Sequence, residues 1–207
     1  MIAIFVLIAY LLGSIPNSVW IGKFFYNIDV REFGSGNAGA TNTFRVLGKK
    51  AGIPVLIFDI LKGTLAVSLS FLTDFDRQSN EFIDLQMGLG IAALIGHIFP
   101  VFAGFRGGKG VATILGVVIC ILPLACSLSL CVFLLVLLST RIVSLSSMIA
   151  GISFPLFLNL ALDNTNPILT VFSIIVSALL IITHRKNIQR LLKKEESKVR
   201  LFPARNK

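Results

Sequence analysis

The chain has few charged residues for its length. Only 14% of its 207 residues are charged, whereas roughly a quarter of the residues of a soluble domain are charged. Apolar residues make up 55% of the chain, and the mean hydropathy is +0.88. We therefore expect lipid, rather than water, to surround most of the chain.

Residues that bind metals or act as nucleophiles are also scarce. The chain has two histidines, His97 and His184, so neither a catalytic triad nor a metal centre is supported. Three cysteines lie in one apolar stretch without a neighbouring histidine or carboxylate: Cys120, Cys126 and Cys131. We interpret them as small apolar residues rather than as a disulfide or metal set, and we expect no metal and no cofactor.

Six apolar segments are long and continuous, which is typical of membrane helices rather than of barrel strands. They cover residues 2–21, 53–73, 85–105, 111–138, 142–162 and 167–183. The first has no basic residues before it, so we interpret it as a span rather than as a signal peptide. The sequence predicts an all-α polytopic transmembrane helix bundle of about seven spans, forming one domain over residues 1–207.

The charges between the segments predict the topology. Four basic stretches are assigned to the cytoplasm by the positive-inside rule: residues 23–50, residues 106–110, Arg141 and the tail from residue 185. The acidic loops at 74–84 and 163–166 are expected outside. The N-terminus is then outside and the C-terminus is cytoplasmic.

The segment at 111–140 has two possible paths. Lys109 and Arg141 are both cytoplasmic only if this segment crosses the membrane twice or not at all. Pro123 lies near its middle and can break a helix. We favour two short crossings; the alternative is one long kinked span that leaves Arg141 outside.

The first basic loop contains the run Gly-Ser-Gly-Asn-Ala-Gly-Ala-Thr-Asn at residues 34–42, followed by Arg45. Small residues let backbone N–H groups approach an anion closely, and Arg45 can bind a phosphate through two donors. We interpret this run as a nest for a phosphorylated ligand. The alternative is a flexible linker.

The second basic loop reads Gly-Phe-Arg-Gly-Gly-Lys-Gly at residues 104–110 and precedes a predicted helix. Glycine amides and a lysine at a helix N-terminus favour an anion. The spacing is not that of a Walker A motif. The alternative is a tight turn whose lysine sets the topology.

Three ionisable residues fall inside predicted spans, where such residues are candidates for function. His97 is a candidate ligand or a structural hydrogen bonder. Asp59 and Lys62 lie three residues apart on one helix face, so they can pair with each other, or Lys62 can reach the interface and face an anion.

The tail begins with an amphipathic stretch. His184 and Asn187 lie three residues apart on one helix face and could meet the glycine loops. The alternative is a basic surface helix attracted to anionic lipid.

These motifs resemble those of the bacterial acyl-phosphate:glycerol-3-phosphate acyltransferases, the PlsY family, and the likeness runs from Gly13 to the tail. Three sets of residues carry it: residues 34–42 with Arg45, Gly96 and His97 with residues 107–110, and a set in the tail comprising His184, Asn187, Arg190 and Glu196. The first two sets together are highly specific.

The resemblance implies an enzyme that transfers a fatty acyl group from acyl phosphate, independently of acyl-CoA, to the 1-hydroxyl of glycerol 3-phosphate. The products would be lysophosphatidic acid and inorganic phosphate, in an early step of bacterial phospholipid synthesis. The protein would be a multi-pass protein of the cell inner membrane with its active site on the cytoplasmic face. Its expected partners are the two substrates and the bilayer, with no nucleic acid; the oligomeric state is left open.

The resemblance also implies roles for individual residues. The catalytic positions are Ser35, Arg45, His184 and Asn187. The positions that bind substrate or phosphate are Gly36, Asn37, Gly39, Thr41, Asn42, Lys62, His97, Gly107, Gly108, Lys109 and Gly110. Glu196 would be a structural carboxylate, but Lys194 stands where the family usually has glycine, so Glu195 is an alternative.

The chemistry agrees with the resemblance. An acyl phosphate is an activated mixed anhydride, so the enzyme need not form a covalent intermediate; it must bring two anionic reactants together. Ser35 is assigned to hydrogen bonding because no base is evident beside it. Either His184 or a substrate phosphate oxygen could take the hydroxyl proton.

Two other functions compete with an acyltransferase. A transporter of small organic phosphates would need polar or broken helices near mid-membrane, whereas the polar motifs here gather at one face. A membrane phosphotransferase acting on a nucleotide-linked lipid would need several metal-binding aspartates. Asp29 is the only aspartate in the predicted cytoplasmic parts.

Overall fold

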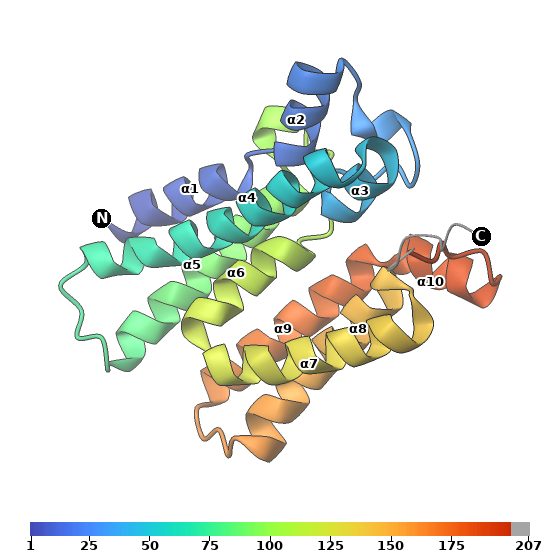
Figure 1. The fold of residues 1–207 in the computed structure, drawn as a ribbon. Helices are drawn as coiled ribbons and strands as arrows, with labels where there is room; N and C mark the ends of the chain where they lie inside the picture. Colours follow the sequence, from blue (N-terminus) through green and yellow to red (C-terminus); the bar gives the residue numbers. More distant parts are fainter. Residues whose placement is uncertain (200–207) are drawn as a thin grey trace. The chain divides into compact units, whose positions relative to one another are not determined.

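A computed structural model describes residues 1–199, and every regular element in that range is a helix (Figure 1). The predicted all-α class is therefore confirmed for this part of the chain. Three of the basic residues predicted for the cytoplasmic tail lie outside the described residues: Arg200, Arg205 and Lys207.

The chain forms two compact units, the first from Met1 to Pro123 and the second from Leu124 onwards. The first unit contains α1 (Ile2–Gly13), α2 (Asn17–Tyr26), η1 (Val30–Glu32), α3 (Ala40–Leu47), α4 (Lys49–Ser68), η2 (Leu69–Leu72), α5 (Asn80–Ile98), η3 (Val101–Ala103) and α6 (Val111–Ile121). The second contains α7 (Pro123–Thr140), α8 (Val143–Leu156), the π-helical turn η4 (Phe157–Ala161), α9 (Pro167–Thr183) and α10 (Arg185–Leu192). The expectation of a single domain stays a prediction.

Four helices in the described range are long and apolar enough to cross a membrane, or six if two bent pairs each count as one span. The four are α4 with η2, α5 with η3, α7, and α8 with η4. The bent pairs are α1 with α2, at 42°, and α9 with α10, at 58°. A seventh crossing would depend on α6, which has only 11 residues, so the count of seven and the orientation of the termini stay predictions.

Prolines break two of the predicted apolar segments. The segment at 111–140 breaks at Leu122, and α7 begins at Pro123, as predicted. The first apolar segment breaks as well, which was not predicted: α1 ends at Gly13, and α2 begins after Pro16. Proline has no amide hydrogen and its ring clashes with the preceding turn, so the break leaves the backbone around Pro16 open to other partners.

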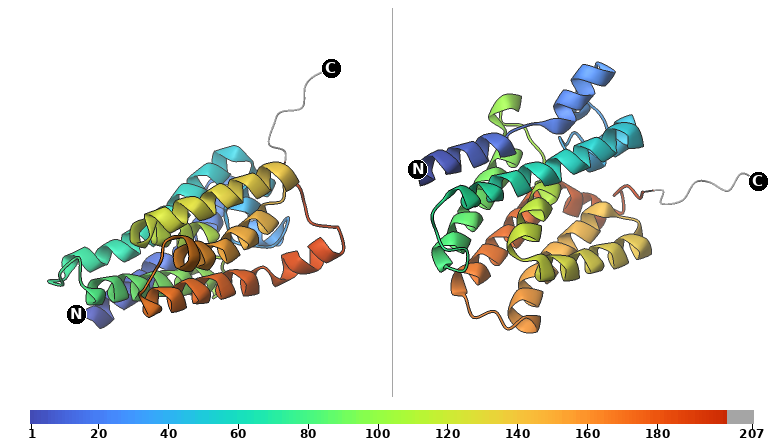
Figure 2. Two further views of the ribbon diagram at one scale, coloured as in Figure 1. Left: turned by 90° about the horizontal axis from the view of Figure 1, so that it is seen from below. Right: turned by 60° about the vertical axis from the view of Figure 1, so that its left-hand side comes forward.

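Glycines allow the helices of the first unit to pack closely. Here α4 packs on α6 and α1 packs on α5; Figure 2 gives two further views of these helices. At the first contact, a Cβ on Gly63 or Gly116 would overlap a backbone oxygen of the facing helix. Gly13 and Gly96 are in the same position at the second contact. Small residues that let backbones approach are typical of helix packing in membranes.

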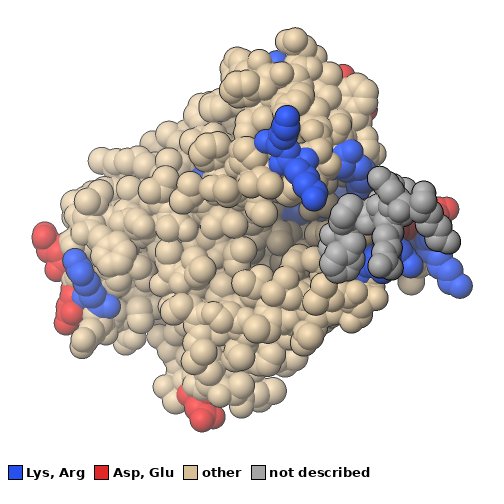
Figure 3. All heavy atoms as spheres, in the orientation of Figure 1, with Lys and Arg blue, Asp and Glu red and all other residues tan. Residues whose placement is uncertain are grey.

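The polar loops of the first unit lie at opposite ends of its helices. The α4–α5 loop lies at one end, and α3 with its preceding loop lies at the other (Figure 1). Acidic side chains gather near the α4–α5 loop, and Lys and Arg side chains gather near α3 (Figure 3). This separation agrees with the predicted placement of these two loops on opposite sides of a membrane.

We expect Gly116→Ala to destabilise the protein by about 1–3 kcal/mol, because the new methyl group would overlap the backbone oxygen of Ile60 and push α4 away from α6. Gly88→Ala is the matched control, since a Cβ there meets nothing within 4 Å. Thermal unfolding in detergent measures both. A Tm for Gly116→Ala equal to that of Gly88→Ala would show that the close approach does not stabilise the bundle.

Candidate active site

The loop at residues 34–42 is held together by the side chain of Asn42. Asn42 is buried in the first turn of α3, and its Nδ2 donates to Val30 O at 2.7 Å and to Phe33 O at 3.1 Å. Its Oδ1 accepts from Ser35 N at 2.8 Å and from Ser35 Oγ at 3.1 Å. The amide group of Asn42 is thus fully used. This geometry favours a positioning role for Asn42, acting through Ser35, over direct phosphate binding.

The rest of this loop is a hydrogen-bonded turn rather than an unstructured linker. Gly36 N donates to Phe33 O at 3.0 Å, and Gly39 N donates to Asn37 O at 3.1 Å. Gly34 and Gly36 have φ values of 62° and 71°, which residues with a side chain rarely adopt. The glycines therefore shape the turn, and two of their amides already have partners within it.

Two residues of α3 present polar groups beside this turn. Thr41 and Arg45 are both exposed and lie four residues apart, on one face of the helix. The Cδ atom of Arg45 lies 3.3 Å from the position that a Cβ on Gly34 would occupy. The stem of Arg45 thus packs beside the residue that precedes Ser35.

The second glycine loop also uses its own amides. Gly107 N and Gly108 N donate to the carbonyl oxygens of residues 98 and 97, at 3.2 and 3.1 Å. Gly110 has a φ of 82° and lies directly before the first residue of α6. The predicted anion site in this loop therefore depends on Lys109 and the start of α6 more than on Gly107 and Gly108.

The two glycine loops contact each other. A Cβ on Gly108 would come within 2.6 Å of Ala38 O and would overlap the ring of His97. Only glycine fits at this position without moving its neighbours. The structure thus brings the two predicted loops and His97 together at one end of the first unit.

A partly buried arginine in the turn that precedes the first loop contacts the second loop. Arg31 Nη1 donates to Ala103 O at 2.8 Å and to Arg106 O at 3.3 Å. Its Nε and Nη2 donate to the two carboxylate oxygens of Asp29, at 3.0 and 2.7 Å. These hydrogen bonds from Arg31 hold the pKa of Asp29 well below its usual range.

Beneath the loops, a carboxylate is buried among polar groups. Asp59 Oδ1 accepts from Asn17 Nδ2 at 2.9 Å and lies 3.1 Å from Lys62 Nζ. Lys62 Nζ also donates to Ile15 O at 2.8 Å, in the break between α1 and α2. Both Asp59 and Lys62 are almost fully buried. The pairing that the sequence left open is confirmed, and it favours a structural role for Lys62.

His97 is buried in the same cluster. Its Nδ1 lies 3.0 Å from Thr113 Oγ1 and 3.8 Å from Asp59 Oδ1. The other side of its ring faces Gly108. These contacts favour the structural alternative for His97, which supports the second glycine loop from below.

The second unit holds a separate polar cluster around Glu196. Its Oε1 accepts from Ser144 Oγ at 2.8 Å and from Asn187 Nδ2 at 2.6 Å, and its Oε2 lies 2.7 Å from Arg190 Nε. Glu195 is exposed, which favours Glu196 as the carboxylate of the tail motif. Burial raises the pKa of Glu196, but the hydrogen bonds from Arg190, Ser144 and Asn187 outweigh burial and lower this pKa overall.

His184 lies at the junction of α9 and α10 and is buried. Its Nδ1 lies 2.7 Å from Leu180 O, which can only accept, so Nδ1 is the donor and Nε2 of the neutral ring is an acceptor. The carbonyl oxygen of His184 accepts from Asn187 N at 2.8 Å. The two residues predicted to be catalytic in the tail therefore belong to one local structure.

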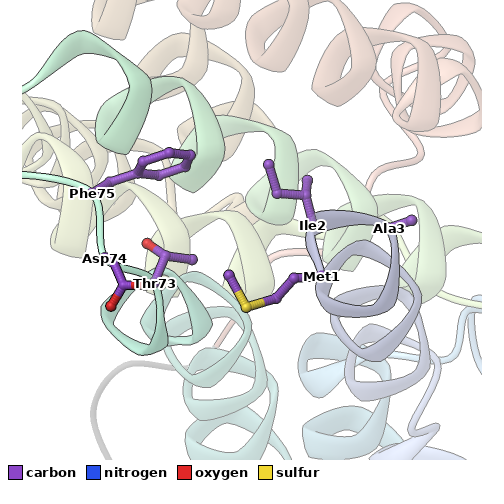
Figure 4. Close-up of a pocket in the computed structure, with 6 residues that line it drawn as sticks. All are labelled: Met1, Ile2, Ala3, Thr73, Asp74 and Phe75. Atoms are coloured by element: carbon purple, nitrogen blue, oxygen red, sulfur yellow. The ribbon is translucent and has the colours of Figure 1, made fainter.

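A hollow also opens at the other end of the first unit. Figure 4 shows its lining, which comes from the start of α1 and from the α4–α5 loop: Met1, Ile2, Ala3, Thr73, Asp74 and Phe75. None of the site residues predicted from the sequence lines it. The candidate site is therefore the loop end of the first unit rather than this hollow.

Several residues of these clusters were not predicted from the sequence. Asn17 is a polar residue inside an apolar segment, which was a signal for a buried partner. Asp29 and Arg31 lie two residues apart with opposite charges, but no local pattern indicates the contact of Arg31 with a loop over 70 residues away. Ser144 gave no signal either, because serine is common at helix starts.

Comparison with known sequences gives one consistent result. A family model described as glycerol-3-phosphate acyltransferase matches residues 3–194. The chain is 46% identical to a glycerol-3-phosphate acyltransferase of Enterococcus faecalis, covering 96% of this chain and 92% of the relative. It is 48% identical to one of Listeria welshimeri, covering 94% of each.

Comparison with solved structures finds glycerol 3-phosphate acyltransferases as well. The chain is similar to a crystal structure of PlsY, an integral membrane glycerol 3-phosphate acyltransferase, in its glycerol 3-phosphate form. The TM-score is 0.86 at 41% identity, over 96% of each chain. A second PlsY structure, the lysophosphatidic acid form, matches with a TM-score of 0.83 at 39% identity, over 96% of this chain and 95% of that one.

We expect Asn42→Asp to destabilise the protein by on the order of 3 kcal/mol and to lower its activity. A carboxylate cannot donate to Val30 O and Phe33 O, and it would place a negative charge against both. Thermal unfolding and activity per folded molecule measure the effect. Gln78→Glu, which makes the same change on an exposed loop, is the control; equal Tm values for the two variants would contradict the role given to Asn42.

We expect Glu196→Gln, but not Glu195→Gln, to lower stability by about 2 kcal/mol at neutral pH, because Glu196 accepts charge-assisted hydrogen bonds. The pKa of Glu196 is lowered by folding, so this stabilisation is present above the usual carboxyl pKa and is lost as the pH falls below it. Tm measured against pH should show the wild type and Glu196→Gln converging in acid. A constant difference down to low pH would count against the ion pair.

Proposed function

The chain belongs to the glycerol-3-phosphate acyltransferase family, and from this premise we propose that it transfers a fatty acyl group from acyl phosphate to the 1-hydroxyl of glycerol 3-phosphate. The products are lysophosphatidic acid and inorganic phosphate. The reaction needs no acyl-CoA and no cofactor, and it is an early step of phospholipid synthesis. The enzyme works on the cytoplasmic face of the inner membrane, with the acyl chain among the spans.

The observation that carries the proposal is the arrangement at the loop end of the first unit. Ser35 is fixed through both its backbone N and its Oγ by Asn42, and the stem of Arg45 packs beside the same turn. The second loop, with Lys109, is packed against the first at Gly108. Arg45, on α3, and Lys109, on the second loop, thus lie on segments whose positions are fixed by hydrogen bonds and close packing.

This arrangement suits the proposed chemistry. Phosphate is a good leaving group from a mixed anhydride, so the main task is to hold two phosphate-bearing substrates together despite their like charge. Arg45 and Lys109 are assigned to the phosphates, because fixed cations stabilise the charge that develops during transfer. Ser35 is assigned to a hydrogen bond with substrate, since the polar atom within reach of its Oγ is the amide oxygen of Asn42 rather than a base.

His184 and Asn187 are proposed as catalytic residues because they match the tail motif. The Nδ1 contact of His184 with Leu180 O leaves Nε2 as the ring atom that can accept the hydroxyl proton. Asn187 is oriented by Glu196. In this proposal Glu196 acts only through Asn187 and Arg190.

The decisive assay follows phosphate release from palmitoyl phosphate by the purified protein in detergent, with and without glycerol 3-phosphate. Palmitoyl-CoA serves as the comparison donor. We expect release that depends on glycerol 3-phosphate and yields lysophosphatidic acid, with no transfer from palmitoyl-CoA. Folded protein that releases no phosphate, or that prefers palmitoyl-CoA, would refute the proposed donor.

Substitutions then test the assigned residues. Ser35→Ala and Arg45→Ala should each lower kcat/KM by about 10²–10³-fold, because the first removes a positioned hydroxyl that hydrogen-bonds the substrate and the second removes a positioned donor to developing charge. Both should leave the Tm near that of the wild type, since Ser35 is half-buried and Arg45 is exposed. Arg77→Ala, on the α4–α5 loop, is the control for loss of a cation. Wild-type kcat/KM in Arg45→Ala would remove that residue from the mechanism.

A further inference from the structure

The turn at residues 29–32 contacts both glycine loops of the first unit. On one side, Val30 O accepts from Asn42 Nδ2, and Asn42 in turn fixes Ser35. On the other side, Arg31 donates to Ala103 O and Arg106 O, directly before Gly107. One short turn therefore sets the position of both loops.

Arg31 is fixed within this turn by a carboxylate. Asp29 accepts from Arg31 N, Nε and Nη2, at 3.0, 3.0 and 2.7 Å. The guanidinium group thus binds Asp29 through Nε and Nη2 and the two carbonyl oxygens through Nη1. Its planar arrangement of donors allows both sets of contacts at once. A lysine ammonium is a compact group on a flexible stem, so it cannot bridge both sets of acceptors in this way.

These contacts differ from those of an ordinary surface ion pair. The side chain of Arg31 is only 14% exposed, and that of Asp29 is 11% exposed. Lys23, which approaches the same carboxylate at 3.4 Å, is 54% exposed, and pairs of that kind contribute little. Arg31 is instead partly buried and bound to the main chain of a distant loop, so losing it would remove a donor from Ala103 O, from Arg106 O and from the Asp29 carboxylate.

We propose that Asp29 and Arg31 are positioning residues that hold the second glycine loop at a fixed distance from Ser35 and Arg45. This inference rests on the proposed function, and it takes the second loop, with Lys109, as the glycerol 3-phosphate site that the family resemblance implies. Loss of the Arg31 contacts lets the loop that carries Lys109 move relative to Ser35. The substrate hydroxyl is then misplaced relative to the acyl group, although every catalytic residue is still present.

The test compares Arg31→Lys and Asp29→Asn with Arg77→Lys, which makes the same exchange on the α4–α5 loop, where Arg77 lies over the ring of Phe71. Steady-state kinetics are measured with palmitoyl phosphate and glycerol 3-phosphate. We expect Arg31→Lys to lower kcat/KM for glycerol 3-phosphate by about 10- to 100-fold, with a raised KM for that substrate and an unchanged KM for palmitoyl phosphate. Arg77→Lys should match the wild type.

Hydrogen–deuterium exchange supplies a readout that does not depend on activity. The amides of Gly107 and Gly108 are hydrogen-bonded in the wild type, so faster exchange over residues 104–110 in Arg31→Lys, with unchanged exchange over residues 73–79, is expected. Unchanged exchange over 104–110, or a lower kcat with an unchanged KM for glycerol 3-phosphate, would overturn the inference. If the wild type shows no transfer at all, the proposed function fails. The exchange comparison alone then tests whether Asp29 and Arg31 hold the second glycine loop in place. Asp29→Asn, which keeps the size of the side chain, serves if Arg31→Lys does not fold.

Discussion

The buried carboxylate of Asp59 is the constraint on which the loop end of the first unit depends. A charge among apolar helices is costly unless it is paired and hydrogen-bonded. Asp59 meets this need with Asn17 and Lys62, and Lys62 needs the carbonyl oxygen that the break at Pro16 exposes. These groups come from α2, α4 and the break after α1, while His97 on α5 and Thr113 on α6 complete the cluster. Satisfying one charge therefore fixes the relative positions of all these segments, directly beneath the two glycine loops.

The glycines of the chain also fix these segments, because they let neighbouring backbones approach closely. Gly63 and Gly116 bring α4 and α6 together, and Gly108 brings the second loop against Ala38 and His97. Many of the glycines thus allow close backbone packing and tight turns, rather than leaving backbone N–H groups available to bind an anion. Ligand recognition at this end of the unit then depends on side chains, above all Ser35 and Lys109 on the two loops and Arg45 on α3.

Composition and charge were sufficient to predict an all-helical membrane protein, and the proline rule was sufficient to predict the break at Pro123. The three-residue spacing of Asp59 and Lys62 allowed their pairing to be foreseen, because that contact lies within one helix. The break at Pro16, the role of Asn42 and the contacts of Arg31 were not foreseen. Each depends on a partner that is remote in sequence or on the conformation of a loop. The open carbonyl oxygen at the Pro16 break is bound by Lys62, Asn42 binds Val30 O, and Arg31 binds Ala103 O. No periodicity or motif encodes such contacts.

The proposed reaction makes rigidity at this end of the protein more valuable than additional catalytic groups. An acyl phosphate already carries its activation, so further acid or base catalysis gains little, whereas two anionic substrates repel each other and must be oriented. A flexible loop would have to be ordered on each binding event, at the cost of binding free energy. Loops that are ordered beforehand, by Asn42 on one side and by Arg31 and His97 on the other, avoid that cost. The free energy of binding the phosphates is then available to bring the hydroxyl and the acyl carbon together.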